Sequence, residues 1–218
     1  MFIGCNTPDA GNHSAPVDSV LPAESPERDT RRVVLFVGTS LTAGYGLGAE
    51  FAYPALIQQK IDSAGLPFRV VNAGVSGETS AGGLRRLDWY LQQPIDVLVL
   101  ELGANDALRG LRPSEMKANL DSIINHTRDR YPDASIVIAG MEAPPNLGET
   151  YTSQFRAVFT DLARAHKAVL IPFLLDGVGG VAELNQEDGI HPTVEGQQIM
   201  AGTVWKTLGP VLTTRATR

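Results

Sequence analysis

The chain has 218 residues, a length that suits one domain or one domain with a tail. Its formal net charge of −6 disfavours nucleic acid or anionic lipid as the main partner, because both need a basic surface. No run of 18 apolar residues occurs, so the sequence predicts no membrane-spanning helix. A single cysteine, Cys5, excludes a disulfide within the chain and a metal site built from cysteines.

Residues 1–31 have the composition of a tail. Residues 6–30 hold four prolines and five acidic residues, and no large apolar cluster that could order them. The preceding tetrad, Phe2-Ile3-Gly4-Cys5, resembles the end of a bacterial lipoprotein signal, in which the cysteine is lipidated, although the charged start and apolar core of such a signal are absent. The alternative is an unordered N-terminus with a chance cysteine.

We therefore expect residues 1–31 to form a tail and residues 32–214 to form the domain. Lipidation of Cys5 would anchor the protein to a membrane and place it in the bacterial periplasm or cell envelope. Without that modification, a cytoplasmic location stays open, and the sequence predicts no particular oligomeric state.

Five apolar runs rich in Val, Ile and Leu predict the strands of a sheet. They cover residues 33–37, 67–71, 95–102, 135–139 and 168–171. Continuous runs of this kind suit strands that are covered on both faces, as in a parallel sheet.

Five further segments have the spacing of amphipathic helices. Apolar residues recur with a helical period over residues 51–64, 79–92, 114–130, 153–167 and about 194–208. Thr193 is expected to cap the last of these helices through its side-chain oxygen. The alternation of strands and helices predicts an α/β fold with a five-stranded parallel sheet between two helical layers. Ligands of such folds bind just beyond the carboxyl ends of the strands.

Polar residues gather where the predicted strands end. Ser40 follows the first strand, and Asp188 and His191 lie in the loop before the last helix. A serine hydroxyl becomes nucleophilic when a neighbouring base, usually histidine, is oriented by a third group. Because residues i and i+3 share one turn, Asp188 can accept from Nδ1–H of His191 and leave Nε2 to take the proton of Ser40. The alternative is that the segment DGIHP is only an Asx-turn followed by a helix cap.

Acyl transfer also needs donors for the oxyanion that develops on the substrate. Three candidates follow the predicted strands: the backbone N–H of Ser40, the backbone of Gly77 and the side-chain amide of Asn105. Taken singly, Gly77 and Asn105 could each serve only to form a turn. They indicate an oxyanion site only when they are taken together.

Four short motifs resemble those of the SGNH/GDSL hydrolase family. GTSL at residues 38–41 resembles the GDSL block, Gly77 in NAGVSGETS the second block, GAND at 103–106 the third, and DGIHP at 188–192 the DxxH block. They occur in the family's order and span the predicted domain. The chain is similar to the small bacterial arylesterase, thioesterase and lysophospholipase type. This resemblance implies the SGNH hydrolase fold, a flavodoxin-like three-layer α/β/α sandwich with a five-stranded parallel sheet.

The resemblance also implies a role for each motif residue. Ser40 would be the nucleophile, His191 the general base and then acid, and Asp188 the residue that orients His191. The amides of Ser40 and Gly77, with the Asn105 side chain, would form the oxyanion hole. Thr39 departs from the family motif, which often has Asp there, and we expect this change to affect local hydrogen bonding and not the mechanism.

The predicted activity is that of a serine esterase acting on small to medium acyl esters, such as aryl esters, and on thioesters or lysophospholipids. Apolar residues that flank the motifs could line a groove for the acyl chain, or could simply pack into the core. These residues are Leu41, Leu108, Leu111, Pro144, Pro145 and Ile190. Arg109 and Arg112 could meet an anionic head group or remain solvated.

Two other functions compete with this prediction. One is a carbohydrate O-acetyl esterase, and the other is a non-catalytic carbohydrate or lipid binding module on the same scaffold. A binding module would not need the set formed by Ser40, Asp188 and His191. The acidic residues and histidines show no metal-ligand spacing, and no phosphate-binding glycine-rich motif occurs, so no metal and no cofactor are expected. The expected partner is a small-molecule ester or thioester.

Overall fold

The computed structural model describes residues 1, 4 and 29–217, and residues 31–218 form one compact unit. The predicted lipidation site at Cys5 and most of the predicted tail lie outside the described residues. Within the described part, no helix has the length and apolar character needed to cross a membrane.

The compact unit is built on a parallel sheet of five strands, as predicted. The strands are β1 (Arg32–Gly38), β2 (Phe68–Gly74), β3 (Val97–Glu101), β4 (Ser135–Ala139) and β5 (Val169–Ile171). Their order in the sheet is β2-β1-β3-β4-β5, with every neighbouring pair parallel. This is the flavodoxin-like order, in which the chain changes direction at β1 and opens a crevice beside the carboxyl end of that strand.

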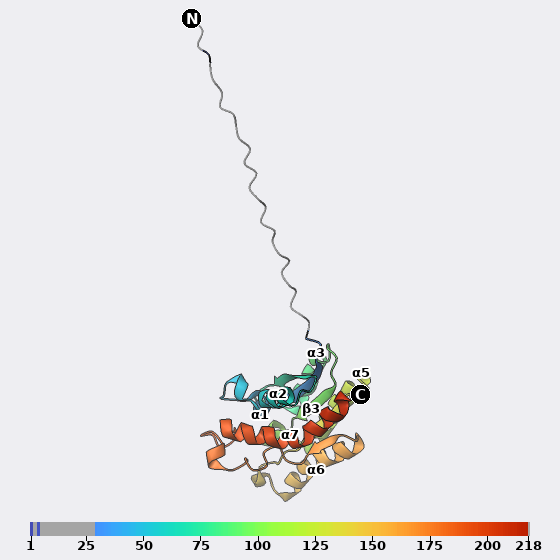
Figure 1. Cartoon of the computed structure of the whole chain (residues 1–218). Coiled ribbons are helices and arrows are strands. Elements are labelled where there is room, and N and C mark those ends of the chain that lie inside the picture. Colours follow the sequence, from blue (N-terminus) through green and yellow to red (C-terminus); the bar gives the residue numbers. More distant parts are fainter. Residues whose placement is uncertain (2–3, 5–28, 218) are drawn as a thin grey trace. The chain divides into compact units, whose positions relative to one another are not determined.

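Five long helices cover the two faces of this sheet (Figure 1). They are α2 (Tyr53–Ser63), α3 (Ser80–Tyr90), α5 (Pro113–Arg130), α6 (Glu149–Ala165) and α7 (Val194–Ala216). Helix α2 packs against α7, whereas α5 packs against both α3 and α6. Right-handed crossovers explain this division: the chain moves from β1 to β2 in one direction and from β2 through β5 in the other, so α2 lies on the opposite face from α3, α5 and α6.

Short elements occupy the loops between these helices and strands. They are the helices α1 (Ser40–Ala43) and α4 (Ala104–Leu108) and the 3₁₀ turns η1 (Ala49–Phe51), η2 (Pro145–Leu147) and η3 (Ala182–Leu184). Both short helices follow the carboxyl ends of strands, so they lie at the edge where the sequence places its polar residues.

The core is the sheet itself together with the inner stripes of the helices. All five residues of β3 are buried, as are the six residues from Val33 to Gly38 of β1. Continuous burial on both faces is the reason that these strands appear in the sequence as uninterrupted apolar runs.

The last helix differs from its prediction at the C-terminal end. It was expected to end near residue 208, but α7 continues to Ala216 through Pro210. A proline removes one N–H from a helix and usually ends or kinks it. Here Leu208 and Leu212, one turn apart, are both fully buried, and this packing keeps the segment helical. The Thr193 cap is confirmed, since its hydroxyl oxygen accepts from the Gly196 N–H at 3.3 Å.

The sharp turn after β1 depends on a close approach of backbone and side chains. Gly38, the last residue of β1, pairs with Gly74 of β2 on one side and with Glu101 of β3 on the other. A Cβ atom on Gly38 would lie 2.0 Å from Oγ1 of Thr42 and 2.7 Å from Oε2 of Glu101. Only glycine leaves room for α1 to start directly above the end of the strand.

Candidate active site

Ser40 is the first residue of α1 and lies at the crevice beside β1. Thr39 caps the helix, because its hydroxyl oxygen accepts from the N–H of Leu41 at 3.3 Å. The cap leaves the N–H of Ser40 outside the helical hydrogen bonds, as expected for the first turn.

A fully buried carboxylate, Glu101, lies beneath this turn. It accepts from the Thr39 N–H at 2.8 Å, from the Thr39 hydroxyl at 3.0 Å and from the Thr42 hydroxyl at 2.7 Å. The Thr42 hydroxyl is also 2.8 Å from the hydroxyl of Tyr53. We call Glu101, Thr39, Thr42 and Tyr53 the Glu101 cluster. Each of these side chains is at most 1% exposed, so the cluster is a closed polar network inside the core.

Burial dominates the electrostatics of this cluster. Desolvation raises the pKa of Glu101, and the hydrogen bonds from Thr39 and Thr42 only partly oppose that effect. Burial and the nearby Glu101 carboxylate hold the pKa of Tyr53 well above its usual value. The sequence reasoning did not single out Glu101, although a charged residue at the end of a buried strand is itself an unusual signal.

The loop of residues 185–193 brings a histidine to Ser40. Nε2 of His191 is 2.9 Å from Oγ of Ser40, and Nδ1 is 2.6 Å from Oδ2 of Asp188. The other carboxylate oxygen of Asp188 accepts from the backbone N–H groups of Ile190 at 2.9 Å and His191 at 3.0 Å. These bonds, led by the one from the His191 backbone, lower the pKa of Asp188 to about 2.

Ser40, Gly77 and Asn105, which carry the three expected oxyanion donors, line one cavity. Among the described residues, no acceptor pairs with the backbone N–H of Ser40 or of Gly77, so both amides are available to a ligand. The Asn105 side chain lies in α4 and donates to the carbonyl of Glu78 at 3.0 Å. That bond holds Asn105 against the loop that carries Gly77.

Helix α4 is in turn fixed to α3 by a buried acid. Asp106 accepts from the backbone N–H of Ser80 at 2.8 Å and from its hydroxyl at 2.5 Å. The contact sets the position of the neighbouring Asn105, since both residues belong to one short helix.

The cavity beside Ser40 has a volume of about 640 Å³ and a largely apolar wall. Five of the six apolar residues predicted to line a groove do line it: Leu41, Leu108, Pro144, Pro145 and Ile190. The sequence reasoning missed other lining residues, notably Tyr45, Met141 and Leu175, which come from loops without a recognisable motif.

Two residues predicted to bind substrate, Arg109 and Leu111, are not among those that line this cavity, and their role stays a prediction. The guanidinium of Arg109 donates to the carbonyl of Gly77, which itself lines the cavity, at 2.9 Å. Leu111 lies outside the wall, and its carbonyl accepts from the Tyr151 hydroxyl at 2.6 Å. Arg112 likewise pairs with Glu115 on the surface.

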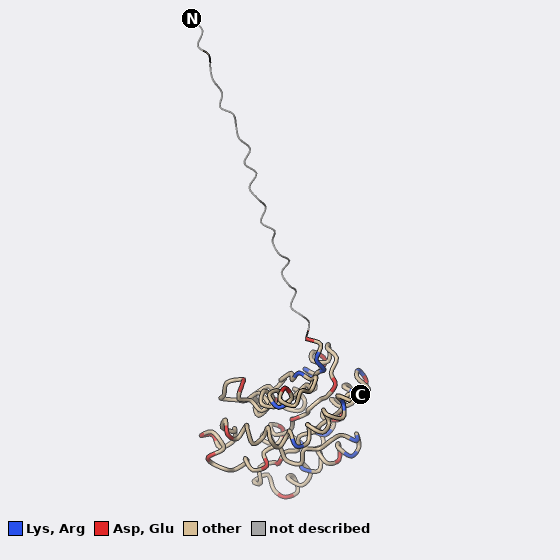
Figure 2. The backbone as a smooth tube through the Cα atoms, in the orientation of Figure 1, with Lys and Arg blue, Asp and Glu red and all other residues tan. Residues whose placement is uncertain are grey.

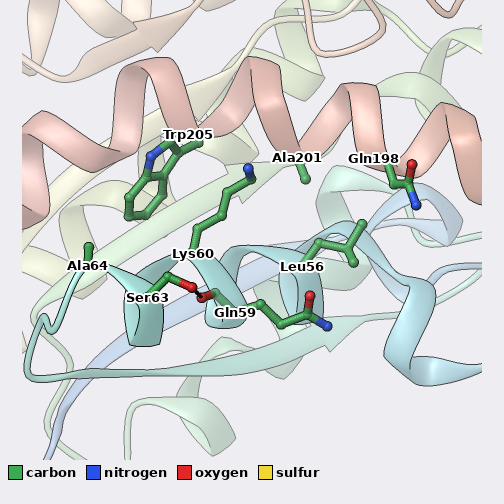
Figure 3. A pocket seen from close by; sticks show the side chains of 8 residues that line it. All are labelled: Leu56, Gln59, Lys60, Ser63, Ala64, Gln198, Ala201 and Trp205. Carbon is green, nitrogen blue, oxygen red and sulfur yellow. Dashed lines mark hydrogen bonds between the residues drawn. The ribbon is translucent and has the colours of Figure 1, made fainter.

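A second cavity, of about 620 Å³, lies between α2 and α7 (Figure 3). Lys60 of α2 and Trp205 of α7 each extend toward the opposite helix across it. It shares no lining residue with the Ser40 cavity and holds none of the motif residues.

The charged positions of the described chain are mixed in sign. Figure 2 shows basic and acidic positions interspersed along the described chain, without a continuous basic face in that view. Over residues 29–217, together with residues 1 and 4, no group of three or more His, Cys, Asp or Glu side chains is arranged to hold a metal ion.

Comparisons with known proteins agree with this geometry. The GDSL-like Lipase/Acylhydrolase family matches residues 36–199. Esterase TesA of Pseudomonas aeruginosa is 41% identical over 182 residues, which cover 83% of this chain and 90% of that protein. The arylesterase of Vibrio mimicus is 36% identical over 77% of this chain and 84% of its own length. Thioesterase 1/protease 1/lysophospholipase L1 of Escherichia coli is 37% identical over 82% of this chain and 84% of its own length.

Solved structures show the same likeness. A crystal structure of TesA is 40% identical and superimposes with a TM-score of 0.78, covering 82% of this chain and 99% of that one. The esterase EstA from Pseudoalteromonas, inhibited by monoethylphosphonate, is 32% identical with a TM-score of 0.78 over 84% of this chain and 99% of its own. The chain therefore belongs to the GDSL-like lipase/acylhydrolase family, also called the SGNH hydrolases, and it is a carboxylic ester hydrolase of that family.

Proposed function

We propose that this esterase works through an acyl-enzyme on Ser40. The observation that carries the proposal is the hydrogen-bonded series from Ser40 Oγ to His191 Nε2 and from His191 Nδ1 to Asp188. In the first step Oγ attacks the ester carbonyl while its proton passes to Nε2. The tetrahedral intermediate then collapses, and the imidazolium returns the proton to the departing alcohol.

In the second half of the cycle water is the nucleophile and Ser40 is the leaving group. His191 takes a proton from the water that attacks the acyl group, and Ser40 leaves with that proton as the acid is released. The low pKa of Asp188 keeps its carboxylate ionised through both steps, so it stabilises the imidazolium each time it forms.

The N–H groups of Ser40 and Gly77 and the Asn105 amide stabilise the oxyanion. The two backbone amides have no other acceptor in the described chain. The Asn105 Nδ2 group donates one hydrogen to Glu78 and has a second hydrogen for the substrate. Removal of one such donor typically costs about 10²–10³ in kcat.

The substrate class that fits best is a small to medium acyl ester. The apolar wall of the cavity suits an acyl chain, and its volume lies within the range typical of small-molecule sites, about 300–1,000 Å³. The names of relatives add further substrate classes, since one is an arylesterase and another is named as a thioesterase and lysophospholipase. Aryl esters, thioesters and lysophospholipids are therefore the substrates to compare.

Two variants and a substrate panel test the proposal. Ser40→Ala should reduce p-nitrophenyl acetate turnover to near background and abolish labelling by a fluorophosphonate probe. Asn105→Ala should keep the labelling site but lower kcat by about 10²–10³. A Ser40→Ala protein that retains most of its turnover would show that the nucleophile has been misassigned. p-Nitrophenyl esters and acyl thioesters of increasing chain length, measured on the unmodified protein, then define the substrate class.

For location, we propose the bacterial periplasm or cell envelope. The support is the Phe2-Ile3-Gly4-Cys5 tetrad alone. Metabolic labelling with a fatty acid, compared between the full chain and Cys5→Ser, tests it. Equal labelling of both chains, or no labelling of either, would contradict lipidation of Cys5.

A further inference from the structure

The proposed base and the acid that orients it belong to one loop. Asp188 and His191 are three residues apart, so their bond orients the imidazole only relative to residues 185–193. Ser40 is 151 positions away in the chain. Other contacts must therefore hold this loop against the nucleophile.

The loop is held in shape by bonds within it and by bonds to the segment just before it. Asn185, which is buried, donates its side-chain amide to the carbonyls of Val178 at 2.7 Å and Val181 at 2.8 Å. Asn185 also pairs with Pro192 in an antiparallel bridge, and the Gln186 N–H donates to the His191 carbonyl at 2.7 Å. The loop therefore keeps its shape and can be positioned as a unit.

The Gln186 side chain connects this unit to the segment after α1. Its Nε2 group donates to the carbonyl of Tyr45 at 2.8 Å and to the carbonyl of Pro192 at 3.0 Å. The Tyr45 N–H in turn donates to the carbonyl of Ser40 at 3.0 Å. A hydrogen-bonded path thus runs from the backbone of the nucleophile to the backbone of the base.

The ring of Tyr45 adds a second contact between the same two segments. Its centroid lies 4.4 Å from the centroid of the His191 ring, and the two planes are tilted by 38°. The ring therefore covers one side of the imidazole. The other link at this end of the fold, Gln197 of α7, accepts from the Tyr53 N–H at 2.8 Å and fixes the helix rather than the loop.

We propose that Tyr45 and Gln186 form a clamp that positions His191 over Ser40. Both are positioning residues, because they act on the backbone and ring of the base and take no part in the proton transfer. The inference rests on the roles proposed above for Ser40 and His191. Because an error of about 1 Å in a reacting geometry can cost about 10² in rate, loss of the clamp should lower kcat.

Gln186→Leu tests the hydrogen-bonded half of the clamp. The variant keeps the approximate side-chain size but removes both donated bonds, and we expect kcat for p-nitrophenyl acetate to fall about 10- to 100-fold with KM within twofold. The rate of fluorophosphonate labelling should fall by a similar factor. Gln58→Leu is the matched control: this partly buried glutamine accepts from the Val70 N–H and donates to the Phe68 carbonyl at the start of β2, away from the carboxyl end of the strand where the site lies. Its kcat should be unchanged.

Tyr45→Ala tests the ring contact, and it should lower kcat about tenfold because the imidazole loses the ring that covers one side of it. Tyr45 also lines the cavity. If its side chain only contacted the substrate, Tyr45→Ala would raise KM and leave kcat unchanged.

Wild-type kcat in Gln186→Leu, or a change in KM alone in Tyr45→Ala, would overturn the clamp. An equal loss of kcat in Gln186→Leu and Gln58→Leu would also overturn it, because that result indicates general destabilisation. Ser40→Ala is measured alongside these variants. Its retained activity would refute the proposed catalytic residues instead, so the two failures are distinguishable.

Discussion

Two acidic residues lie near Ser40, the proposed nucleophile, and their surroundings are opposite. Glu101 is fully buried in the Glu101 cluster, and desolvation raises its pKa. The Asp188 side chain is 39% exposed, and hydrogen bonds from its own loop lower its pKa to about 2. Glu101 receives donors from the turn that carries Ser40, whereas Asp188 receives donors from the segment that carries His191.

The difference separates structural support from participation in the reaction. A buried carboxylate with several donors holds the backbone around it in one geometry, and its removal leaves those donors unsatisfied. An exposed carboxylate remains charged, and its negative charge can stabilise an imidazolium that forms and disappears in each cycle. Substitution at Glu101 should therefore mainly affect folding, and substitution at Asp188 should mainly affect turnover.

Among the changes that test this comparison, Asp188→Asn should give the largest effect, a decrease in kcat of about 10⁴-fold. The carboxamide keeps the size of the side chain but no longer holds Nδ1–H of His191 as a charged acceptor. The midpoint of thermal unfolding should change little, because the side chain is partly exposed. Steady-state kinetics measure kcat, and a melting curve on the same preparation measures the midpoint. A large drop in the midpoint with normal kcat would show that Asp188 supports the fold and not the reaction.

Glu101→Leu should come next, with a loss of about 3 kcal/mol in the free energy of unfolding. The Thr39 N–H and two threonine hydroxyls lose their shared acceptor in the core. Urea denaturation measures the loss. The folded fraction should keep kcat within about tenfold, and a defect in kcat as severe as that of Asp188→Asn would mean that Glu101 takes part in the reaction.

Thr42→Val should cost about 1–2 kcal/mol, because the hydroxyl has two buried partners, Glu101 and Tyr53. Thr127→Val is a matched control, since Thr127 is equally buried but bonds only to the carbonyl of Ile123 in its own helix. Its cost should be smaller, because that carbonyl can also accept the backbone N–H of the helix. Equal costs in urea denaturation would show that the Glu101 cluster adds nothing beyond single hydrogen bonds.

The pH dependence of stability should give the smallest effect, with opposite signs for the two acids. Asp188 has a lowered pKa in the folded state, so its contribution is present above pH 4 and is lost as the pH falls from about 4 to about 2. Glu101 has a raised pKa in the folded state. As the pH rises above about 4.5, its ionisation therefore destabilises the folded state.

Unfolding in urea over a pH series tests these signs. Relative to the unmodified protein, Asp188→Asn should lose less stability below pH 4, and Glu101→Gln should lose less stability as the pH rises above about 4.5. Parallel curves for all three proteins would contradict both assignments.

Several local features of the fold were predictable because they depend on neighbouring residues in the chain. The five apolar runs predicted all five strands, and burial on both faces explains why. The helical spacing predicted the five long helices, with errors at the start of α6, which begins at Glu149 and not at 153, and at the end of α7. There, Gly209 and Pro210 disfavour a helix locally, and the burial of Leu212 against the rest of the fold outweighs that preference.

The motif residues of the candidate site were also visible in the sequence. Ser40 follows a buried strand, and Asp188 and His191 are one turn apart, so their types and spacing already indicate acyl transfer. The family comparison confirms that class of activity.

The supports of that site were decided only by the tertiary structure. Glu101 meets Thr39 and Thr42, about 60 positions away, because β1 and β3 are neighbours in the sheet. Gln186 reaches Tyr45 across 141 positions, and Arg109 donates to the carbonyl of Gly77 across 32 positions. Local spacing in a sequence reports which residues share a strand, a helix face or a turn, whereas contacts between distant segments follow from how the sheet and its loops pack.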